Sequence, residues 1–512
     1  MKNNNDIITT LAEMPTGSKC VIVKVNGHGG LRHRLMELGF VKGETVTVIK
    51  NAPLLDPVEY QIMQAHISLR RSEANKVEVV AVDDNYTNTQ DFNGTIADDV
   101  ISNVIKEKTN NITVALVGNP NAGKTSFFNH ATGLHEKVGN YGGVTVDLKL
   151  GTFYHKGYTI NLVDLPGTYS ITEFTPEERY VRDYLTKNNP DMVLNIVDAS
   201  NLERNLFLTT QLVDMNVRIV MALNMYDEMT AKGDALDYQA LGKMMGFPIV
   251  PTTAVKGIGI PDVYEEKKNL SKHIHINYGR DIEEAIVPIK KQIELNKDII
   301  NIYPARYIAI NVLENTKSTV EEIQNLPNGK EIIAEATEKR LELERDYNED
   351  VYTLLTNARY AFIRGALKET YRKSEKKIKN HAYRADDILT NKWLGFPILI
   401  FFMWLMFQAT FTIGAYPQAW IESAVEWFGG KVYSLMSDGI LRDLIVDGII
   451  AGVGGVLVFL PNILILFLFI SILEDTGYMA RAAFIMDKLM HRIGLHGKSF
   501  IPLIMGFGCN VP

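Results

Sequence analysis

Charge is distributed very unevenly along this chain of 512 residues, and this limits the folds that it can adopt. Charged residues occur throughout the first 390 positions, whereas residues 393–416 contain none and residues 445–473 contain only Asp447. The uncharged run 394–416 is long enough to cross a bilayer once with some tilt; a buried core helix is the alternative. The sequence therefore predicts a soluble front that is joined to a membrane domain.

The second apolar run, residues 445–473, is irregular. It contains GVGG at 452–455 and a proline, Pro461, that is expected to break the helix between Leu460 and Asn462. Interrupted apolar segments in transporters often expose backbone at the substrate site, and a simple kink is the alternative. Glu474 and Asp475 follow this run, where an interfacial cap is favoured over a metal ligand.

Basic residues precede the first apolar run and set its expected orientation. By the positive-inside rule they place the preceding domains in the cytoplasm, and the N-terminus lacks the pattern of a signal peptide. The two cysteines, Cys20 and Cys509, offer no disulfide framework, which suits a reducing compartment. The basic residues are Arg372, Lys373, Lys376, Lys377, Lys379, Arg384 and Lys392.

Changes in sequence pattern divide the chain into five parts. Residues 1–83 hold short β-branched runs at 20–25, 45–49, 62–69 and 76–82 and one short helix at 31–38, as in a small β-barrel. Residues 84–110 are polar and resemble a linker. Residues 111–264 alternate apolar strands with helical patterns, which predicts a parallel sheet covered by helices on both faces. Residues 265–385 are helical, and residues 386–512 begin a polytopic membrane domain.

The strongest motif in residues 111–264 is GNPNAGKT at 118–125, which lies between an apolar strand and a helical stretch. Backbone N–H groups and a helix N-terminus converge on phosphate in this context, and a chance glycine-rich turn is the alternative. Lys124 is expected to pair with the β- and γ-phosphates, and the Thr125 hydroxyl to bind Mg²⁺. The contacting residues are expected to be Gly118, Asn119, Pro120, Asn121, Ala122, Gly123, Lys124, Thr125 and Ser126.

Two further motifs follow in the order of a switch GTPase. DLPG places Asp164 to hold Mg²⁺ and the Gly167 N–H to meet the γ-phosphate, with Leu165 and Pro166 between them. NMYD, which comprises Asn224, Met225, Tyr226 and Asp227, places a carboxylate where it can accept two hydrogen bonds from guanine. Adenine lacks that donor pair and would leave Asp227 unsatisfied, so the expected nucleotides are GTP and GDP rather than ATP.

Two weaker elements complete this site. Thr253, Ala254 and Val255 follow the strand PIVP, where a loop usually supports the base. In VGNYGGVTV, Gly143 and Val144 precede Thr145, a candidate switch I threonine for Mg²⁺ whose alternative is an ordinary strand threonine. Thr168 follows DLPG in place of a water-orienting glutamine, so slow or assisted hydrolysis is expected.

With VGNPNAGKTSFFN, VGNYGGVTV, DLPGTYS and NMYD, residues 111–264 resemble the G domain of the bacterial ferrous iron transport protein B family. RLMELGF at 34–40 and ISLRRSEANKVEV at 67–79 resemble the SH3-like ferrous iron transport protein A. Residues 265–385 look like the helical spacer of this family, similar to a nucleotide-dissociation-inhibitor domain. WLGFPI, GGVLVFLPNILILF, EDTGYMARAAF and GFGCNVP resemble its membrane part, with the first gate motif.

The resemblance implies GTP-dependent Fe²⁺ uptake across the bacterial inner membrane. It places the potassium-binding asparagine of the family on Asn121, where K⁺ acts as an activator, and it makes Lys124, Thr145, Gly167 and Asn121 the catalytic set. A lone buried cysteine is ordinarily a small hydrophobe, but the match to GFGCNVP makes Cys509 a candidate Fe²⁺ ligand. The resemblance also implies that the chain is the front portion of a longer protein.

The sequence says less about binding of nucleic acid, metal ions or other proteins. A net charge of −7 argues against nucleic acid, and His28, His33, His66 and Cys20 do not fall at metal-ligand spacing. We expect the barrel to be an intramolecular or intermolecular interaction module, and assembly into a homo-oligomer stays open. The competing hypothesis is a membrane-anchored signalling GTPase without transport, which needs neither the interrupted apolar segment nor Cys509.

Overall fold

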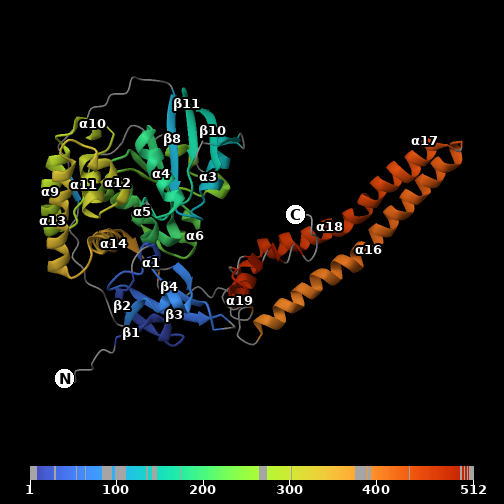
Figure 1. Ribbon diagram of the computed structural model, residues 1–512, viewed down its shortest axis with the longest axis horizontal. Coiled ribbons are helices and arrows are strands. Elements are labelled where there is room, and N and C mark those ends of the chain that lie inside the picture. Colours follow the sequence, from blue (N-terminus) through green and yellow to red (C-terminus); the bar gives the residue numbers. More distant parts are fainter. Residues whose placement is uncertain are drawn as a thin grey trace.

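The computed structural model describes residues 8–27, 30–52, 55–63, 65–82, 95–97, 111–133, 136–140, 147–172, 174–264, 274–300, 302–374, 389, 394–437, 439–495, 499–500, 502–503 and 506. The described residues form three folded parts and a pair of long helices that projects away from them (Figure 1). The multidomain layout predicted from the sequence is confirmed, whereas the exact domain boundaries stay predictions.

The N-terminal part, called here the β-domain, is an antiparallel sheet with the strand order β1-β6-β2-β3-β4-β5. The predicted third strand at 62–69 is confirmed only from Ala65, where β5 begins; Ile62 ends the preceding strand, and the chain reverses after Met63, a residue with φ of 45°. No glycine or proline marks that reversal in the sequence. The elements are β1 Thr9–Thr10, β2 Lys19–Val25, α1 Gly30–Glu37, β3 Thr45–Asn51, β4 Val58–Ile62, β5 Ala65–Leu69, α2 Arg71–Ala74 and β6 Val77–Ala81.

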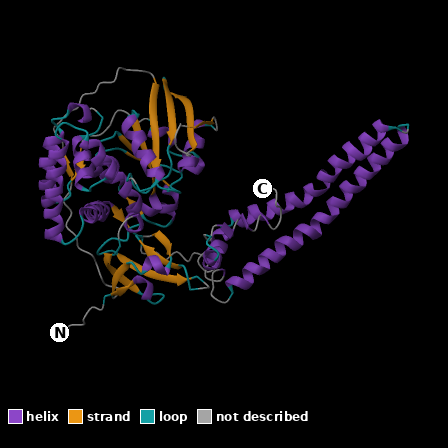
Figure 2. Ribbon diagram, in the orientation of Figure 1, coloured by secondary structure: helices purple, strands orange, loops and turns teal. Residues whose placement is uncertain are grey.

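The central part is a sheet of seven strands in the order β15-β13-β12-β8-β11-β10-β9. Strands β8, β11, β12, β13 and β15 pair in parallel, and β10 is antiparallel to β9 and β11. The strands are β8 Asn111–Gly118, β9 Glu136–Asn140, β10 Asp147–His155, β11 Tyr158–Asp164, β12 Met192–Asp198, β13 Ile219–Asn224 and β15 Ile249–Pro251. Helices α3 Lys124–Thr132, α4 Pro176–Lys187, α5 Leu202–Asp214, α6 Tyr226–Ala231, α7 Tyr238–Met245 and α8 Ile260–Val263 surround it (Figure 2).

Strand β8 shows why the sheet needs cover on both faces. Val114 and Leu116 belong to one buried cluster with Phe127 of α3, whereas Ala115 and Val117 belong to another. Successive side chains of a strand point to opposite faces, so a strand that is apolar at every position must be buried on both. The predicted parallel sheet with two covered faces is confirmed.

The third part is helical, as predicted, and packs beside the central sheet (Figure 1). Its helices are α9 Arg280–Ile293, α10 Lys297–Ile300, α11 Ala305–Leu313, α12 Lys317–Gln324, α13 Gly329–Tyr347 and α14 Val351–Thr370. The region predicted as a linker contributes one strand, β7 Thr95–Ala97, which pairs antiparallel with β16 Ile274–Ile276. A second short pair joins β14 Ala235–Leu236 to β17 Tyr371–Arg372.

The apolar segments are longer and less interrupted than predicted. Helix α16 covers Gly395–Leu435, and α18 covers Ala451–Asp475 with Pro461 inside it. The expected break at Pro461 is therefore wrong, since one missing N–H and a fixed φ can be accommodated within a long helix. Both helices are long and apolar enough to cross a membrane by length and composition. Helix α17 Ile440–Asp443 and the π-helical turn Leu444–Ile450 lie between them, and α19 Tyr478–Arg492 follows.

Candidate nucleotide-binding site

The predicted phosphate loop joins β8 to α3, as a strand–loop–helix motif requires. Gly123 has φ of +90°, and a Cβ there would lie 2.1 Å from Nδ2 of Asn224. A Cβ on Gly118 would lie 2.4 Å from the carbonyl oxygen of Ile196. Asn121 is left-handed, with φ of 68°, a conformation that asparagine tolerates better than most residues. Close approach of other atoms explains the two glycines, and the left-handed backbone explains the asparagine at position 121.

The DLPG segment lies against this loop. Nζ of Lys124 is 3.1 Å from Oδ1 of Asp164, and both side chains are about nine-tenths buried. A Cβ on Gly167 would lie 3.1 Å from Cα of Pro120, so the two segments are in close contact. The N–H of Thr168 donates to the carbonyl oxygen of Gly118 over 3.2 Å. The structure thus brings the first two motifs together.

Asn224 links the remaining motifs, and it is 2% exposed. Its Nδ2 donates to the carbonyl oxygen of Ala122 over 2.8 Å, and its Oδ1 accepts from the N–H of Ala254 over 2.8 Å. One amide group therefore joins NMYD to the phosphate loop and to the loop after β15. The sequence placed Asn224 in the site but gave it no such role, because these partners are 102 and 30 residues away.

Asp227 lies in the first turn of α6 and remains accessible, with its side chain 40% exposed. Nζ of Lys256 lies 2.7 Å from its Oδ2, and this contact holds the pKa of Asp227 below its ordinary value. The carboxylate is therefore charged near neutral pH and able to accept hydrogen bonds. Val255, the third member of the predicted base loop, is 74% exposed.

The site is rich in oxygen donors, which suit Mg²⁺. Thr125 and Ser126 lie in the first turn of α3, beside the strand end that carries Asp164. Asn119 is 3% exposed, and its two amide atoms have no hydrogen-bond partner among the described residues. Such an amide is costly when buried, which fits a loop that a bound group completes.

Some predicted residues cannot be placed. Gly143, Val144 and Thr145 lie outside the described residues, as do His28 and Cys509. Of the other scattered candidates, Cys20 is fully buried, and burial raises the pKa of its thiol to about 12. His66 lies 2.7 Å from Glu59 on the β-domain. The described residues contain no group of three or more metal-ligating side chains of the His, Cys, Asp and Glu types.

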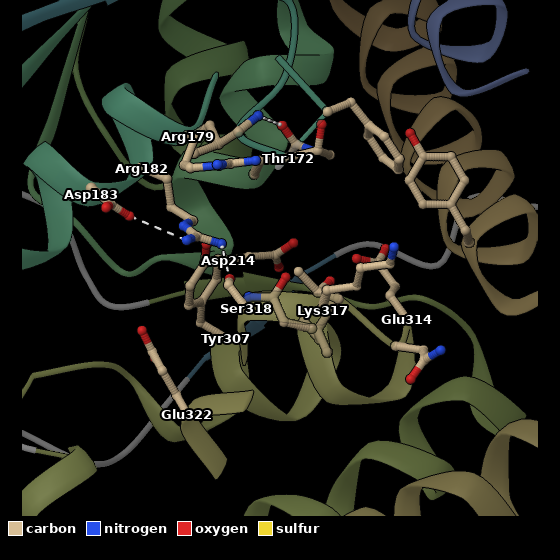
Figure 3. Close-up of a pocket in the computed structure, with 18 of the residues that line it drawn as sticks. Thr172, Arg179, Arg182, Asp183, Asp214, Tyr307, Glu314, Lys317, Ser318 and Glu322 are labelled. Carbon is tan, nitrogen blue, oxygen red and sulfur yellow. Dashed lines mark hydrogen bonds and ion pairs between the residues drawn. The ribbon is translucent and has the colours of Figure 1, made fainter. Parts of the chain in front are cut away.

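A separate cavity of about 710 Å³ lies between the central and helical parts, and His33 of the β-domain also lines it (Figure 3). Thr172 lines one edge, and Arg182 of α4 lies opposite α12, where it donates to Oγ of Ser318 over 2.8 Å. Asp214 and Glu314 line the same cavity, and both form ion pairs with Arg359 of α14, over 3.3 and 3.2 Å. The cavity is lined by residues of both parts, and none of the phosphate-loop residues lines it.

Four family patterns match the chain in succession. They are the FeoA domain at residues 9–81, ferrous iron transport protein B at 112–267, the FeoB cytosolic helical domain at 278–372 and the gate pattern, described as nucleoside recognition, at 456–512. The order and the positions agree with the folded parts described above. The chain belongs to the ferrous iron transport protein B family.

Two named relatives match most of this chain. The chain is 48% identical to the Fe(2+) transport protein A/Fe(2+) transporter FeoB fusion protein of Porphyromonas gingivalis, over 98% of this chain and 63% of that protein. It is 42% identical to the Fe(2+) transporter FeoB of Staphylococcus aureus, over 78% of this chain and 60% of that protein. The chain thus spans somewhat under two thirds of the length of these relatives. A crystal structure of an S. thermophilus NFeoB mutant bound to GDP matches 51% of this chain and all of its own, with 34% identity and a TM-score of 0.46.

Proposed function

We propose that this protein binds and hydrolyses GTP, and that its G domain controls or drives the uptake of Fe²⁺ across a bacterial inner membrane. The observation that carries the proposal is the convergence of the phosphate loop, DLPG, NMYD and the loop after β15 at one edge of the sheet. Ligands of open α/β sheets bind at the carboxyl ends of the strands. Asn224 holds three of these four segments together.

The phosphate side of the site is built for charge neutralisation. Lys124, already next to Asp164, would pair with the β- and γ-phosphates, and the N–H of Gly167 would meet the γ-phosphate. Mg²⁺, held by Thr125, Asp164 and Thr145, would neutralise the charge that develops between these phosphates. Positioning and electrostatics supply most of the catalysis of phosphoryl transfer, so the fixed contact between Gly167 and the phosphate loop matters.

The base side of the site selects guanine. Asp227 is charged and accessible, and it forms an ion pair with Lys256, whose side chain is 61% exposed. Exchanging that exposed ion pair for two hydrogen bonds from guanine costs little, since such pairs contribute roughly 0–1 kcal/mol. Adenine would leave the carboxylate facing groups that cannot donate to it, which disfavours ATP.

Hydrolysis is expected to be slow and assisted by K⁺. The Thr168 hydroxyl, 4% exposed, donates to the carbonyl oxygen of Ser170 over 2.6 Å and so is committed within the protein. It replaces the glutamine that orients water in other switch GTPases. The exposed side chain of Asn121 lies on the phosphate loop, where it would help to hold K⁺. This ion would add positive charge beside the phosphates.

For the membrane part, we propose that α16 and α18 are spans of a multi-pass domain whose preceding domains are cytoplasmic. Nδ2 of Asn462 donates to Oε1 of Gln418 over 2.9 Å, a polar contact between two apolar helices. Polar side chains within apolar spans are costly in lipid, so this pair marks a position with a structural or transport role. Cys509 remains a proposed Fe²⁺ ligand, and a homo-oligomer would supply additional spans around the path.

Phosphate release from GTP and from ATP by the purified chain, in buffer with K⁺ and Mg²⁺, tests the enzymatic part. GTP should be hydrolysed, and ATP should be hydrolysed at least about a hundredfold more slowly. Lys124→Ala should abolish most of the GTP hydrolysis, whereas Lys243→Ala, a change at an exposed lysine of α7, should not alter it. Equal rates with both nucleotides would refute the assignment of the base site.

A further inference from the structure

A carboxyl group of the β-domain is buried at its boundary with the G domain. Glu37 is the last residue of α1 and is 6% exposed. Negative charge is disfavoured at a helix C-terminus. Its side-chain contacts among the described residues are hydroxyl groups and the nearby carboxyl of Glu178 rather than cations. Burying a carboxyl group without a cation costs free energy of folding, so its presence indicates that Glu37 has a function at this position.

The partner of Glu37 belongs to the segment that follows DLPG. Oγ of Ser170, fully buried, donates to Oε1 of Glu37 over 2.6 Å. The hydroxyl of Thr172 lies 3.0 Å from Oγ of Ser170 and donates to Oε2 of Glu178 over 2.6 Å. Residues 167–172, called here the switch segment, therefore run from the phosphate loop directly to the β-domain.

The same helix is fixed on its other sides. The ring of His33 stacks on Phe174 with 3.9 Å between the ring centroids. The hydroxyl of Tyr360, in α14, donates to the backbone oxygen of Glu37 over 3.1 Å. Arg32 forms an ion pair of 2.6 Å with Asp350, at the start of α14. Helix α1 is thus held by the helical part while Glu37 reaches the switch segment.

The opposite side of the switch segment offers less support. Ile171, Thr172 and Phe174 line the cavity of about 710 Å³ described above, and Thr172 is drawn at its edge (Figure 3). Side chains that border open space lose packing contacts on that side. Within the G domain, the N–H of Ile171 donates to Oε1 of Gln211 over 2.8 Å. The hydroxyl of Thr172 donates to Glu178, also within the G domain. The contact of Ser170 with Glu37 is a further tie, and it comes from another domain.

We propose that Glu37 is a positioning residue for GTP hydrolysis: it holds Ser170 and thereby keeps Gly167 beside the phosphate loop. This inference rests on the proposed GTPase function. It assigns the β-domain a direct contact with the segment that meets the γ-phosphate. GDP lacks the γ-phosphate. Loss of the contact between Glu37 and Ser170 should therefore impair hydrolysis of GTP and leave GDP binding unchanged.

Hydrogen exchange of the switch segment tests the contact itself. In the full chain bound to GDP, Glu37→Ala should accelerate exchange of the backbone N–H groups of residues 168–172 on the order of tenfold, as expected for loss of one buried hydrogen bond. Glu37→Gln, which keeps an oxygen acceptor, should restore most of the protection. Glu13→Ala changes an exposed carboxylate elsewhere on the β-domain and should have no effect. Unchanged exchange in Glu37→Ala would overturn the proposal.

A double-mutant cycle tests the consequence for catalysis. Glu37→Ala and Ser170→Ala should each lower kcat for GTP several-fold, and the double variant should be no slower than the worse single variant. The Kd for GDP should stay within about twofold in all three, which separates positioning from loss of the fold. Multiplicative effects on kcat, or equal losses of GDP binding, would contradict a positioning role. If the unmodified chain binds GDP but does not hydrolyse GTP, the proposed enzyme activity fails, while the exchange experiment still decides whether Glu37 holds the segment.

Discussion

The side-chain nitrogen of Asn224 donates a hydrogen bond of 2.8 Å to the carbonyl oxygen of Ala122, which ties the end of β13 to the phosphate loop. The same side chain accepts from the N–H of Ala254. A fully buried amide with partners on two loops fixes the distance between the phosphate side and the base side of the site. We therefore expect Asn224 to help set the spacing between these two sides.

Asn224→Ala should lower GDP affinity by at least about tenfold and the free energy of unfolding by roughly 1–3 kcal/mol, because a buried N–H and a buried carbonyl lose their partner. Asn195 provides a matched control: it is 1% exposed on β12 and donates to Oγ1 of Thr209 over 2.7 Å, away from the loops. Asn195→Ala should destabilise the protein to a similar degree without changing GDP affinity. Calorimetric titration and thermal unfolding give both quantities.

Asp227→Ala should remove the preference for guanine. Affinity for GTP should fall by at least about a hundredfold, and affinity for ATP should change little, because only guanine donates two hydrogen bonds to this carboxylate. Competition binding against a fluorescent GDP analogue measures both constants. Glu228→Ala, at the neighbouring exposed position of α6, should leave both unchanged. A similar drop in both nucleotides would point to damage of the fold instead of loss of base recognition.

Asn121→Gly should reduce the stimulation of GTP hydrolysis by K⁺ over Na⁺ to nearly none while GDP binding persists. Glycine removes the amide and accepts the φ of 68° without strain, whereas Asn121→Ala adds a cost of about 1–2 kcal/mol from the left-handed backbone. Comparing the two variants separates the effect of losing the amide group from the effect of straining the loop backbone. Equal rates in K⁺ and Na⁺ for the unmodified chain would exclude the proposed activation.

The sequence predicted the sheet and the order of its motifs because each motif follows an apolar strand. Parallel strands bring their carboxyl ends to one edge, so Gly118, Asp164 and Asn224 had to be neighbours once the strands were recognised. The residues that we propose to contact phosphate or base fall in short motifs of the sequence. Their partners across the site, such as Ala122 for Asn224, depend on loop conformations that no spacing encodes.

Other features could not be predicted from local patterns. The reversal at Met63 lacks the usual turn residues, and Pro461 lies within a helix whose neighbours favour continuation. The contact of Glu37 with Ser170 joins positions 133 residues apart in different domains. A glutamate at the end of a short helix is usually solvated, so its burial only emerges when the domains are packed together.

The stability of the β-domain contact should depend on pH. Burial, and next the charge of Glu178, raise the pKa of Glu37 to about 7 from an ordinary 4.5, although hydrogen bonds from Ser170 and Thr172 act in the opposite direction. Burial lowers the pKa of His33 to about 4, so this ring is neutral above that pH. The unfolded chain releases the Glu37 proton first, so the contribution of Glu37 to the free energy of unfolding should fall as pH rises from about 4.5 to about 7. The contribution of His33 has the opposite sign and should rise between about pH 4 and about pH 6.5.

Glu37→Gln has no such titration. The melting temperatures of the two proteins should be similar near about pH 5, and the unmodified protein should melt lower than the variant near about pH 8. Other titrating groups, Glu203 among them, act in both proteins and cancel in the difference. A constant difference across this range would mean that Glu37 is not the titrating group.

Uptake of radioactive Fe²⁺ tests the central claim most directly. The complete gene product is placed in vesicles with GTP in the compartment that contains its G domain, and it is compared with Lys124→Ala and with the control Lys243→Ala. The account predicts that uptake in the unmodified protein and in Lys243→Ala exceeds that of empty vesicles, and that Lys124→Ala loses most of it. Uptake that is equal in Lys124→Ala and in the unmodified protein would contradict control of transport by the G domain, and GTP hydrolysis without any uptake would favour a membrane-anchored signalling GTPase.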